Sequence, residues 1–117
     1  MAYDGDLADR VRALLDGEPD LTEREMFGGL AFCIGGNMAV SVSGQGGLLV
    51  RVDPAESDAL VATTSAMPME MRGKPMQGWL RVDAEDVGTK RELARWVELG
   101  RTCAASLPAK QTTVERR

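Results

Sequence analysis

The stretch MFGGLAFCIGGNMAVSVSGQGGLLVRV, residues 26–52, decides the fold of this chain. Apolar side chains alternate with small or polar ones along residues 38–43, and along residues 48–52 Leu48, Val50 and Val52 share one parity while Leu49 and Arg51 take the other. A period of two is typical of strands that bury one face. The glycine-rich segments between the apolar runs supply the positive φ that short hairpin turns need. Within residues 23–52 we therefore predict three antiparallel strands, the first of them over residues 26–34.

Three helices are predicted around these strands from apolar spacing and from capping residues. The first covers residues 5–16, where four apolar side chains share one helical face. The second covers residues 54–62 and follows Asp53, an N-cap residue with a proline at the next position. The third covers residues 90–107 and begins with a capping box formed by residues 89–92.

Two further strands are predicted between the second and third helices. In the first of them Met67, Met69 and Met71 share one face, where we expect them to fill the core rather than to bind Cu(I) through their thioethers. The order α-β(3)-α-β(2)-α predicts a two-layer α+β domain, with a five-stranded antiparallel sheet and helices on one face. This domain is expected over residues 1–108, and residues 109–117 are expected to form a flexible basic tail.

The second face of the sheet is the expected interaction surface. The alternation places these ten side chains on it: Phe27, Ala31, Cys33, Ala39, Leu49, Arg51, Glu70, Arg72, Trp79 and Arg81. Aromatic and arginine side chains are typical anchors of protein interfaces, so five of the ten are the candidate interaction residues. They are Phe27, Arg51, Arg72, Trp79 and Arg81. The same set suits the stacking of single-stranded bases, and a small-molecule site between helix and sheet is a further alternative.

The residue inventory disfavours an enzyme. The chain contains no histidine, which removes the commonest general base and the commonest metal ligand. We therefore predict no catalytic residues, no metal and no cofactor.

Cys33 and Cys103 are expected to be small core side chains, with a disulfide as the alternative. The glycines at 28–29 and 35–36 lie within or between strands, not between a strand and a helix, so they do not predict a phosphate-binding loop.

The charge is unevenly distributed along the chain. The net charge is −4, which disfavours nucleic-acid binding by the whole surface. Residues 72–117 nevertheless carry 10 basic and 6 acidic side chains, a local net of +4. This half forms either a local basic patch or a solvated helix face with a charged tail. The basic side chains in question are Arg72, Lys74, Lys90, Arg91, Arg95 and Arg101.

Neither a bilayer-spanning apolar run nor a signal peptide is recognisable, so we expect a cytoplasmic protein that does not bind membranes.

Four stretches, taken in this order and spacing, resemble the N-terminal domain of the TfoX/Sxy family over about residues 7–110. They are Met26-Phe27-Gly28-Gly29, Leu49-Val50-Arg51-Val52-Asp53, Gly73-Lys74-Pro75-Met76-Gln77-Gly78-Trp79, and Leu93-Ala94-Arg95-Trp96 with Ser106-Leu107-Pro108. The family is named for a bacterial competence regulator. The resemblance implies a two-layer fold similar to type III secretion chaperones, and it brings no catalytic residues with it.

These observations together predict a small, non-catalytic regulatory or protein-interaction module that acts through the open sheet face. Its expected partner is another protein or a second copy of the same chain. The alternative is a nucleic-acid-binding regulator, related to competence or transcription, that uses the basic C-terminal half.

Overall fold

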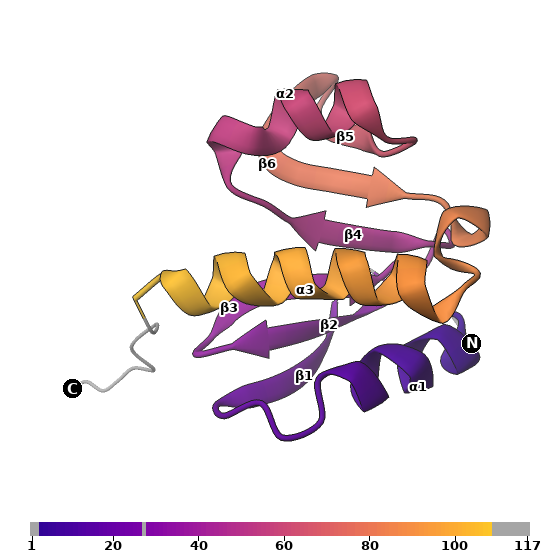
Figure 1. Cartoon of the computed structure of the whole chain (residues 1–117), viewed down its shortest axis with the longest axis vertical. Coiled ribbons are helices and arrows are strands. Elements are labelled where there is room, and N and C mark those ends of the chain that lie inside the picture. Colours follow the sequence, from indigo (N-terminus) through magenta and orange to yellow (C-terminus); the bar gives the residue numbers. More distant parts are fainter. Residues whose placement is uncertain (1–2, 27, 109–117) are drawn as a thin grey trace.

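The computed structural model describes residues 3–26 and 28–108. Here six strands form one antiparallel sheet, accompanied by three α-helices and a short 3₁₀-helix, η1 (Figure 1). The elements follow one another as α1 (Gly5–Leu14), β1 (Leu21–Met26), β2 (Gly29–Ile34), β3 (Asn37–Val42), β4 (Leu48–Arg51), α2 (Pro54–Thr63), β5 (Met67–Met71), β6 (Lys74–Val82), η1 (Ala84–Val87) and α3 (Lys90–Ser106). The predicted α+β class is confirmed. The tail expected over residues 109–117 lies outside the described residues. Within them, no helix has both the length and the apolar character that crossing a bilayer requires.

The prediction of five strands is wrong, because residues 21–34, of which 26–34 were expected to form one strand, are a hairpin of β1 and β2. Met26 pairs with Gly29 across a tight turn that contains Gly28, and Gly28 has a φ of 76°. Glycine adopts this left-handed conformation without the steric cost that a side chain brings. Short hairpin turns depend on such residues. The turn creates β1 as an additional strand at the edge of the sheet.

The starts of α2 and α3 confirm the capping predictions. The side chain of Asp53 accepts a hydrogen bond from the backbone N–H of Ala55 at 2.9 Å. At α3, Thr89 Oγ1 accepts from the N–H of Glu92 at 3.1 Å, and Glu92 Oε1 accepts from the N–H of Thr89 at 3.2 Å. Both sets of contacts satisfy N–H groups that would otherwise lack intrahelical partners.

All three helices contribute to one core on one face of the sheet. The strand order is β1-β2-β3-β4-β6-β5; α3 packs mainly on β3 and β4, and α2 packs on β6 (Figure 1). The core between the layers contains fully buried side chains from both, among them Phe32, Val40, Val50, Leu80 and Leu93. Burying a side chain of this kind contributes about 1.5–3 kcal/mol. We therefore attribute most of the stability of the domain to this face.

The closest approach between helix and sheet occurs at Gly100 of α3. A Cβ at this position would lie 2.4 Å from the backbone oxygen of Ala39 and 2.8 Å from a methyl carbon of Val40. The helix can occupy this position only because the residue has no side chain. A register shift between Phe32 and Cys33 alters the pairing of β2 with β3 in the same region. Ala39 consequently packs on the helix side, which corrects its predicted place on the open face.

The methionine-rich strand β5 faces the opposite way from the prediction. Met67 pairs with Arg81 and is 58% exposed, whereas Pro68 pairs with a core leucine of β6. Residues that pair directly across two strands project to the same face. Met67 and Met69 therefore lie on the face away from the helices and do not fill the core. The side chain of Met71 lies outside what the structure describes.

Candidate functional site

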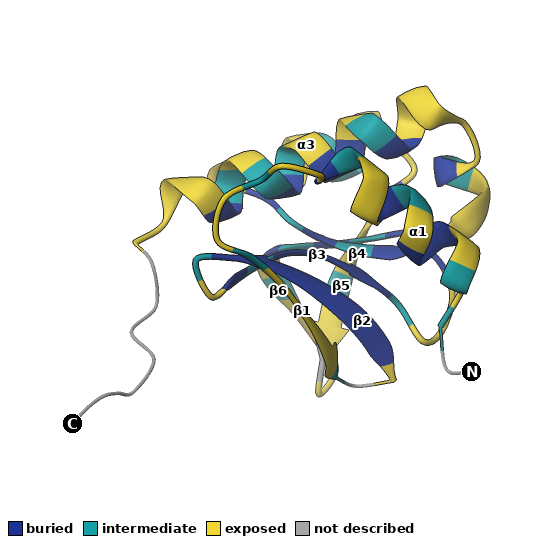
Figure 2. Cartoon of the chain, turned by 90° about the horizontal axis from the view of Figure 1, so that it is seen from below, coloured by how far each residue is buried: buried dark blue, intermediate teal, exposed yellow. Residues whose placement is uncertain are grey.

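The face of the sheet away from the helices, here called the far face, is concave. β1 and β5 lie at opposite ends of the strand order, and five strand spacings of about 4.8 Å would separate them by about 24 Å in a flat sheet. Met26 on β1 and Met69 on β5 nevertheless line the same pocket. The two edges of the sheet therefore curl toward each other on the side away from α1 and α3 (Figure 2).

The pocket on this concave face has a volume of about 230 Å³ and a mainly apolar lining. Its large apolar residues are Met26, Met38, Leu48, Leu49 and Met69. Its polar side chains are Ser41, Ser43, Gln45 and Arg81. Arg81 Nη1 donates a hydrogen bond to Gln45 Oε1 at 2.8 Å, which holds the guanidinium beside the pocket. Methionine is flexible and polarizable, so this lining can adapt to apolar groups of different shape.

Three of the five predicted interaction residues lie together on the far face. Arg51 of β4 pairs with Trp79 of β6, and Arg81 follows on the same face of β6. Arg72 does not join them, because it lies exposed in the turn between β5 and β6 with a φ of 56°. Phe27 lies outside the described residues. The structure therefore brings together one aromatic side chain and two arginines.

The guanidinium of Arg51 covers the ring of Trp79, with its central carbon 4.5 Å from the ring centroid. Arg51 Nη1 is buried and has no hydrogen-bond partner among the described residues. A buried donor without a partner costs about 1–3 kcal/mol, and a cation–π contact of this kind returns about 0.5–2 kcal/mol. The contact also covers one face of the indole ring, and a nucleic-acid base cannot stack on that face.

Two arginines on the helix side, Arg12 and Arg101, are paired with carboxylates. Arg12 of α1 donates from Nε and Nη2 to the two carboxylate oxygens of Glu23 at 2.7 and 2.8 Å. These hydrogen bonds lower the pKa of Glu23. Arg101 of α3 lies 3.5 Å from Glu18 and forms hydrogen bonds to Glu98, which lower the pKa of Glu98. Both cations are therefore already neutralised within the chain.

A second pocket, of about 560 Å³, lies between the start of α2 and the C-terminal half of α3. Cys103 lines it together with the acidic residues Asp53, Glu56 and Glu98. Burial raises the pKa of the Cys103 thiol; Arg51 opposes this rise, and Asp53 and Glu56 add to it. The thiolate is the nucleophilic form of cysteine, so these surroundings disfavour nucleophilic chemistry at this position.

The two cysteines lie on opposite faces of the sheet. Cys33 pairs with Met38 and projects to the far face, whereas Cys103 belongs to α3 on the helix side. The sheet between them keeps the two thiols apart and excludes the alternative of a disulfide within this fold.

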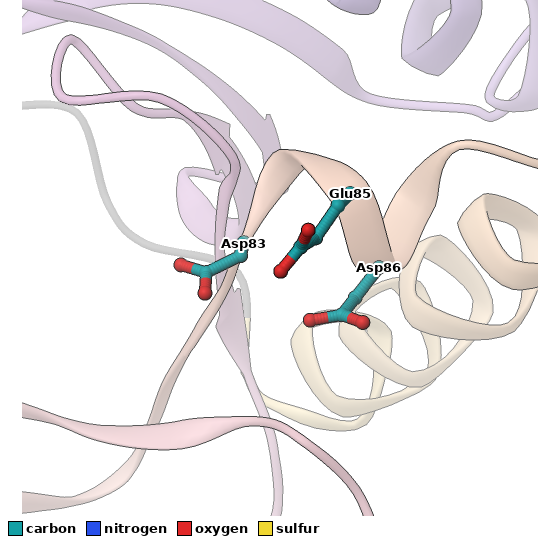
Figure 3. Close-up of side chains that lie close together, drawn as sticks. All are labelled: Asp83, Glu85 and Asp86. Carbon is teal, nitrogen blue, oxygen red and sulfur yellow. The ribbon is translucent and has the colours of Figure 1, made fainter.

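Three acidic side chains gather at η1 (Figure 3). One carboxylate oxygen from each of Asp83, Glu85 and Asp86 lies within 4.8 Å of the others. Oxygen ligands suit Mg²⁺ and Ca²⁺. Asp83 and Glu85 are exposed, however, and acidic neighbours on one short segment often meet at a surface without binding an ion. Their proximity alone does not define a metal site.

The basic residues of the second half do not form one patch in the described part of the chain. Lys74 begins β6 and Lys90 follows η1, so the nine residues of β6 separate them, roughly 26 Å at about 3.3 Å per residue. Arg101, a third member of the set, is ion-paired. A nucleic-acid backbone is normally followed by a continuous basic stripe, which these positions do not provide.

The sequence pattern misses residues that shape the pocket on the far face. If the alternation is carried through Gly28, it places Met26 on the helix face; a turn at Gly28 places Met26 on the far face instead. The glycine pair at 28–29 is the one signal that permits a turn here, although glycine is equally compatible with a continuing strand. The meeting of Met26 with Met69 has no such signal, because it depends on the curl of the whole sheet.

Comparison with known protein families adds an independent finding. The family model described as the TfoX N-terminal domain matches residues 13–104 of this chain. This range contains all six strands and most of α3. No curated protein matches the sequence.

Proposed function

The chain belongs to the family of TfoX N-terminal domains, and from this we propose that it is a non-catalytic regulatory module that binds a protein partner through the far face. One observation carries the proposal. The far face holds an apolar pocket beside Arg81, while all three helices pack on the opposite face. Because the helices pack on the other face of the sheet, they support this concave surface from behind.

The composition of the far face supports a protein partner. Methionine, arginine and tryptophan are enriched in protein interfaces, and all three types lie on this one face of the sheet. Catalysis receives no comparable support. Histidine is absent from the sequence, and burial raises the pKa of the Cys103 thiol.

The proposal is tested by affinity capture from a lysate of the source cells, using the purified chain and one variant of each face. Leu49→Glu introduces a carboxylate into the pocket lining. Ala105→Glu introduces the same group at an exposed position of α3 and serves as the matched control. Circular dichroism and a thermal melt first establish that both variants are folded.

We expect a partner protein that the wild type and Ala105→Glu retain equally and that Leu49→Glu retains at least about tenfold less, because a carboxylate in an apolar contact is costly to bury. Equal capture by all three proteins would contradict binding through the far face. Loss of the captured material after nuclease treatment would instead favour the nucleic-acid-binding regulator.

A further inference from the structure

The far face carries positive charge and no carboxylate at its paired strand positions. Glu70, predicted on this face, alternates with Met69 of the pocket lining and therefore projects to the opposite face. A row of directly paired residues crosses the sheet from Arg24 of β1 to Arg81 of β6, so both side chains project to this face. The pairing places these charged residues of the described strands on the far face: Arg24, Arg51, Lys74 and Arg81. Glu23 and Glu25 alternate with Arg24 and project to the helix side. The chain as a whole is acidic, with a net charge of −4, so this placement does not reflect composition.

None of these four cations forms an ion pair with a described residue. The contrast with Arg12 and Arg101 is direct, because those two arginines of the helix side are neutralised by glutamates. Arg81 is held by a neutral partner, Gln45, which leaves its charge uncompensated. Cations left unpaired on one concave face attract an anionic partner and orient its approach.

The size of the pocket indicates what kind of group enters it. Its volume of about 230 Å³ is below the roughly 300–1,000 Å³ of typical sites for drug-sized ligands. A space of this size and lining suits one or two apolar side chains of a partner chain. Such an anchor in a pocket is the usual centre of a protein interface.

Two other occupants fit the far face less well. A second copy of the chain in a symmetric face-to-face dimer would bring arginines against arginines, since each copy presents the same patch. Single-stranded nucleic acid is held mainly by aromatic platforms. Trp79 is the aromatic residue that the structure describes on this face, and Arg51 covers one side of its ring.

We propose that the far face docks an acidic segment of a partner protein. An apolar side chain of that segment fills the pocket between Met26 and Met69, and carboxylates flanking it pair with Arg24 and Arg81. The inference rests on the proposed function and defines the chemistry of the partner.

The test uses fluorescently labelled synthetic peptides and measures their binding to the intact chain by anisotropy. The first peptide carries one leucine flanked by glutamates. The second replaces the glutamates with lysines, the third replaces the leucine with alanine, and an oligodeoxythymidylate serves as the nucleic-acid probe. We expect the first peptide to bind at least about tenfold more tightly than each of the others, and more weakly when salt rises from about 0.05 to 0.3 M.

Two charge reversals locate the binding on the protein. Arg81→Glu is expected to weaken the binding of the first peptide by about tenfold or more, because it removes a cation at the pocket and adds a repelling charge. Arg91→Glu makes the same change at an exposed position of α3 and is expected to alter binding by less than about twofold. Both variants leave the core untouched, so they are expected to fold.

Equal binding of the glutamate and lysine peptides, preference for the oligonucleotide, or no binding at all would each overturn the acidic-segment inference. The proposed function would still hold if affinity capture recovered a cellular partner with the wild type and with Arg81→Glu but not with Leu49→Glu. If capture is also insensitive to Leu49→Glu, the proposed function fails as well.

Discussion

The two faces of the sheet are built from the same strands and differ in almost every physical property. On the helix side Phe32, Val40 and Val50 are fully buried, and Arg12 of α1 and Arg101 of α3 are paired with glutamates. On the far face methionines lie partly exposed around a pocket, and Arg81 has only a neutral partner. The helix side therefore combines large buried apolar groups with two neutralised arginines, whereas the pocket on the far face combines partly exposed methionines with an arginine that has no ion pair among the described residues.

This difference separates the residues that stabilise the domain from the residues that can bind. A side chain on the helix face contributes through burial and packing, so its loss leaves a cavity. The partly exposed side chains of the pocket, such as Met26, Leu49 and Met69, already contact solvent, so their loss should affect recognition more than folding. The curl of the sheet gives the far face a defined concavity without a covering layer.

The largest expected effect comes from deleting one core side chain on the helix face. Phe32→Ala should lower the free energy of unfolding by about 3–5 kcal/mol, because the ring is fully buried and the space cannot close completely. Leu49→Ala, at a half-buried position of the far face, should lower it by less than about 1.5 kcal/mol. Urea unfolding followed by circular dichroism measures both. Similar losses for the two variants would show that the far face is part of the core.

An intermediate effect is expected where α3 meets β3. Gly100→Ala should lower the free energy of unfolding by about 1–3 kcal/mol, since the added Cβ would meet the backbone oxygen of Ala39 at 2.4 Å. Gly88→Ala is the matched control. Its φ is −70°, and its Cβ would lie 3.6 Å from the nearest atom, a backbone oxygen. In thermal melts the Tm of Gly88→Ala should lie within a few degrees of that of the wild type. A loss of stability as large as that of Gly100→Ala would contradict the close-packing explanation.

The smallest expected effect concerns the paired charges of the helix side. Arg12 lowers the pKa of Glu23 in the folded chain, so Glu23 contributes stability that is present above its ordinary pKa of about 4.3 and is lost as the pH falls through the lowered value. Glu23→Gln should therefore reduce stability slightly near pH 7 and weaken its decline below about pH 4.5. Urea midpoints across this pH range provide the measurement.

Glu25→Gln is the control for the acid prediction, because it removes the same charge from the same strand. Among the described residues no ion pair joins Glu25 to a basic group. This variant should follow the pH dependence of the wild type. If Glu25→Gln reduces the loss of stability at acid pH as much as Glu23→Gln does, the contact with Arg12 is not the cause of that pH dependence.

Features that depend on neighbouring residues were predictable from the sequence. The capping box of Thr89 and Glu92 involves four consecutive positions, and the alternation along β3 and β4 reports burial of one face directly. The choice between strand and turn at Gly28 was not determined in this way. Glycine is compatible with both conformations, so the alternation alone cannot show where a strand ends. That one position changed the number of strands and the face to which Met26 belongs.

The sequence by itself determined the α+β class, the helices, the absence of histidine and the family to which the chain belongs. Only the tertiary structure decided which side chains share the far face and that this face is concave. The reason is physical. Strand alternation is a local property, whereas the position of Met26 beside the same pocket as Met69 depends on the twist of all six strands and on the register shifts in β2 and β5. The ion pair of Arg12 with Glu23 and the neutral partner of Arg81, Gln45, follow from that same arrangement, because each joins residues distant in sequence.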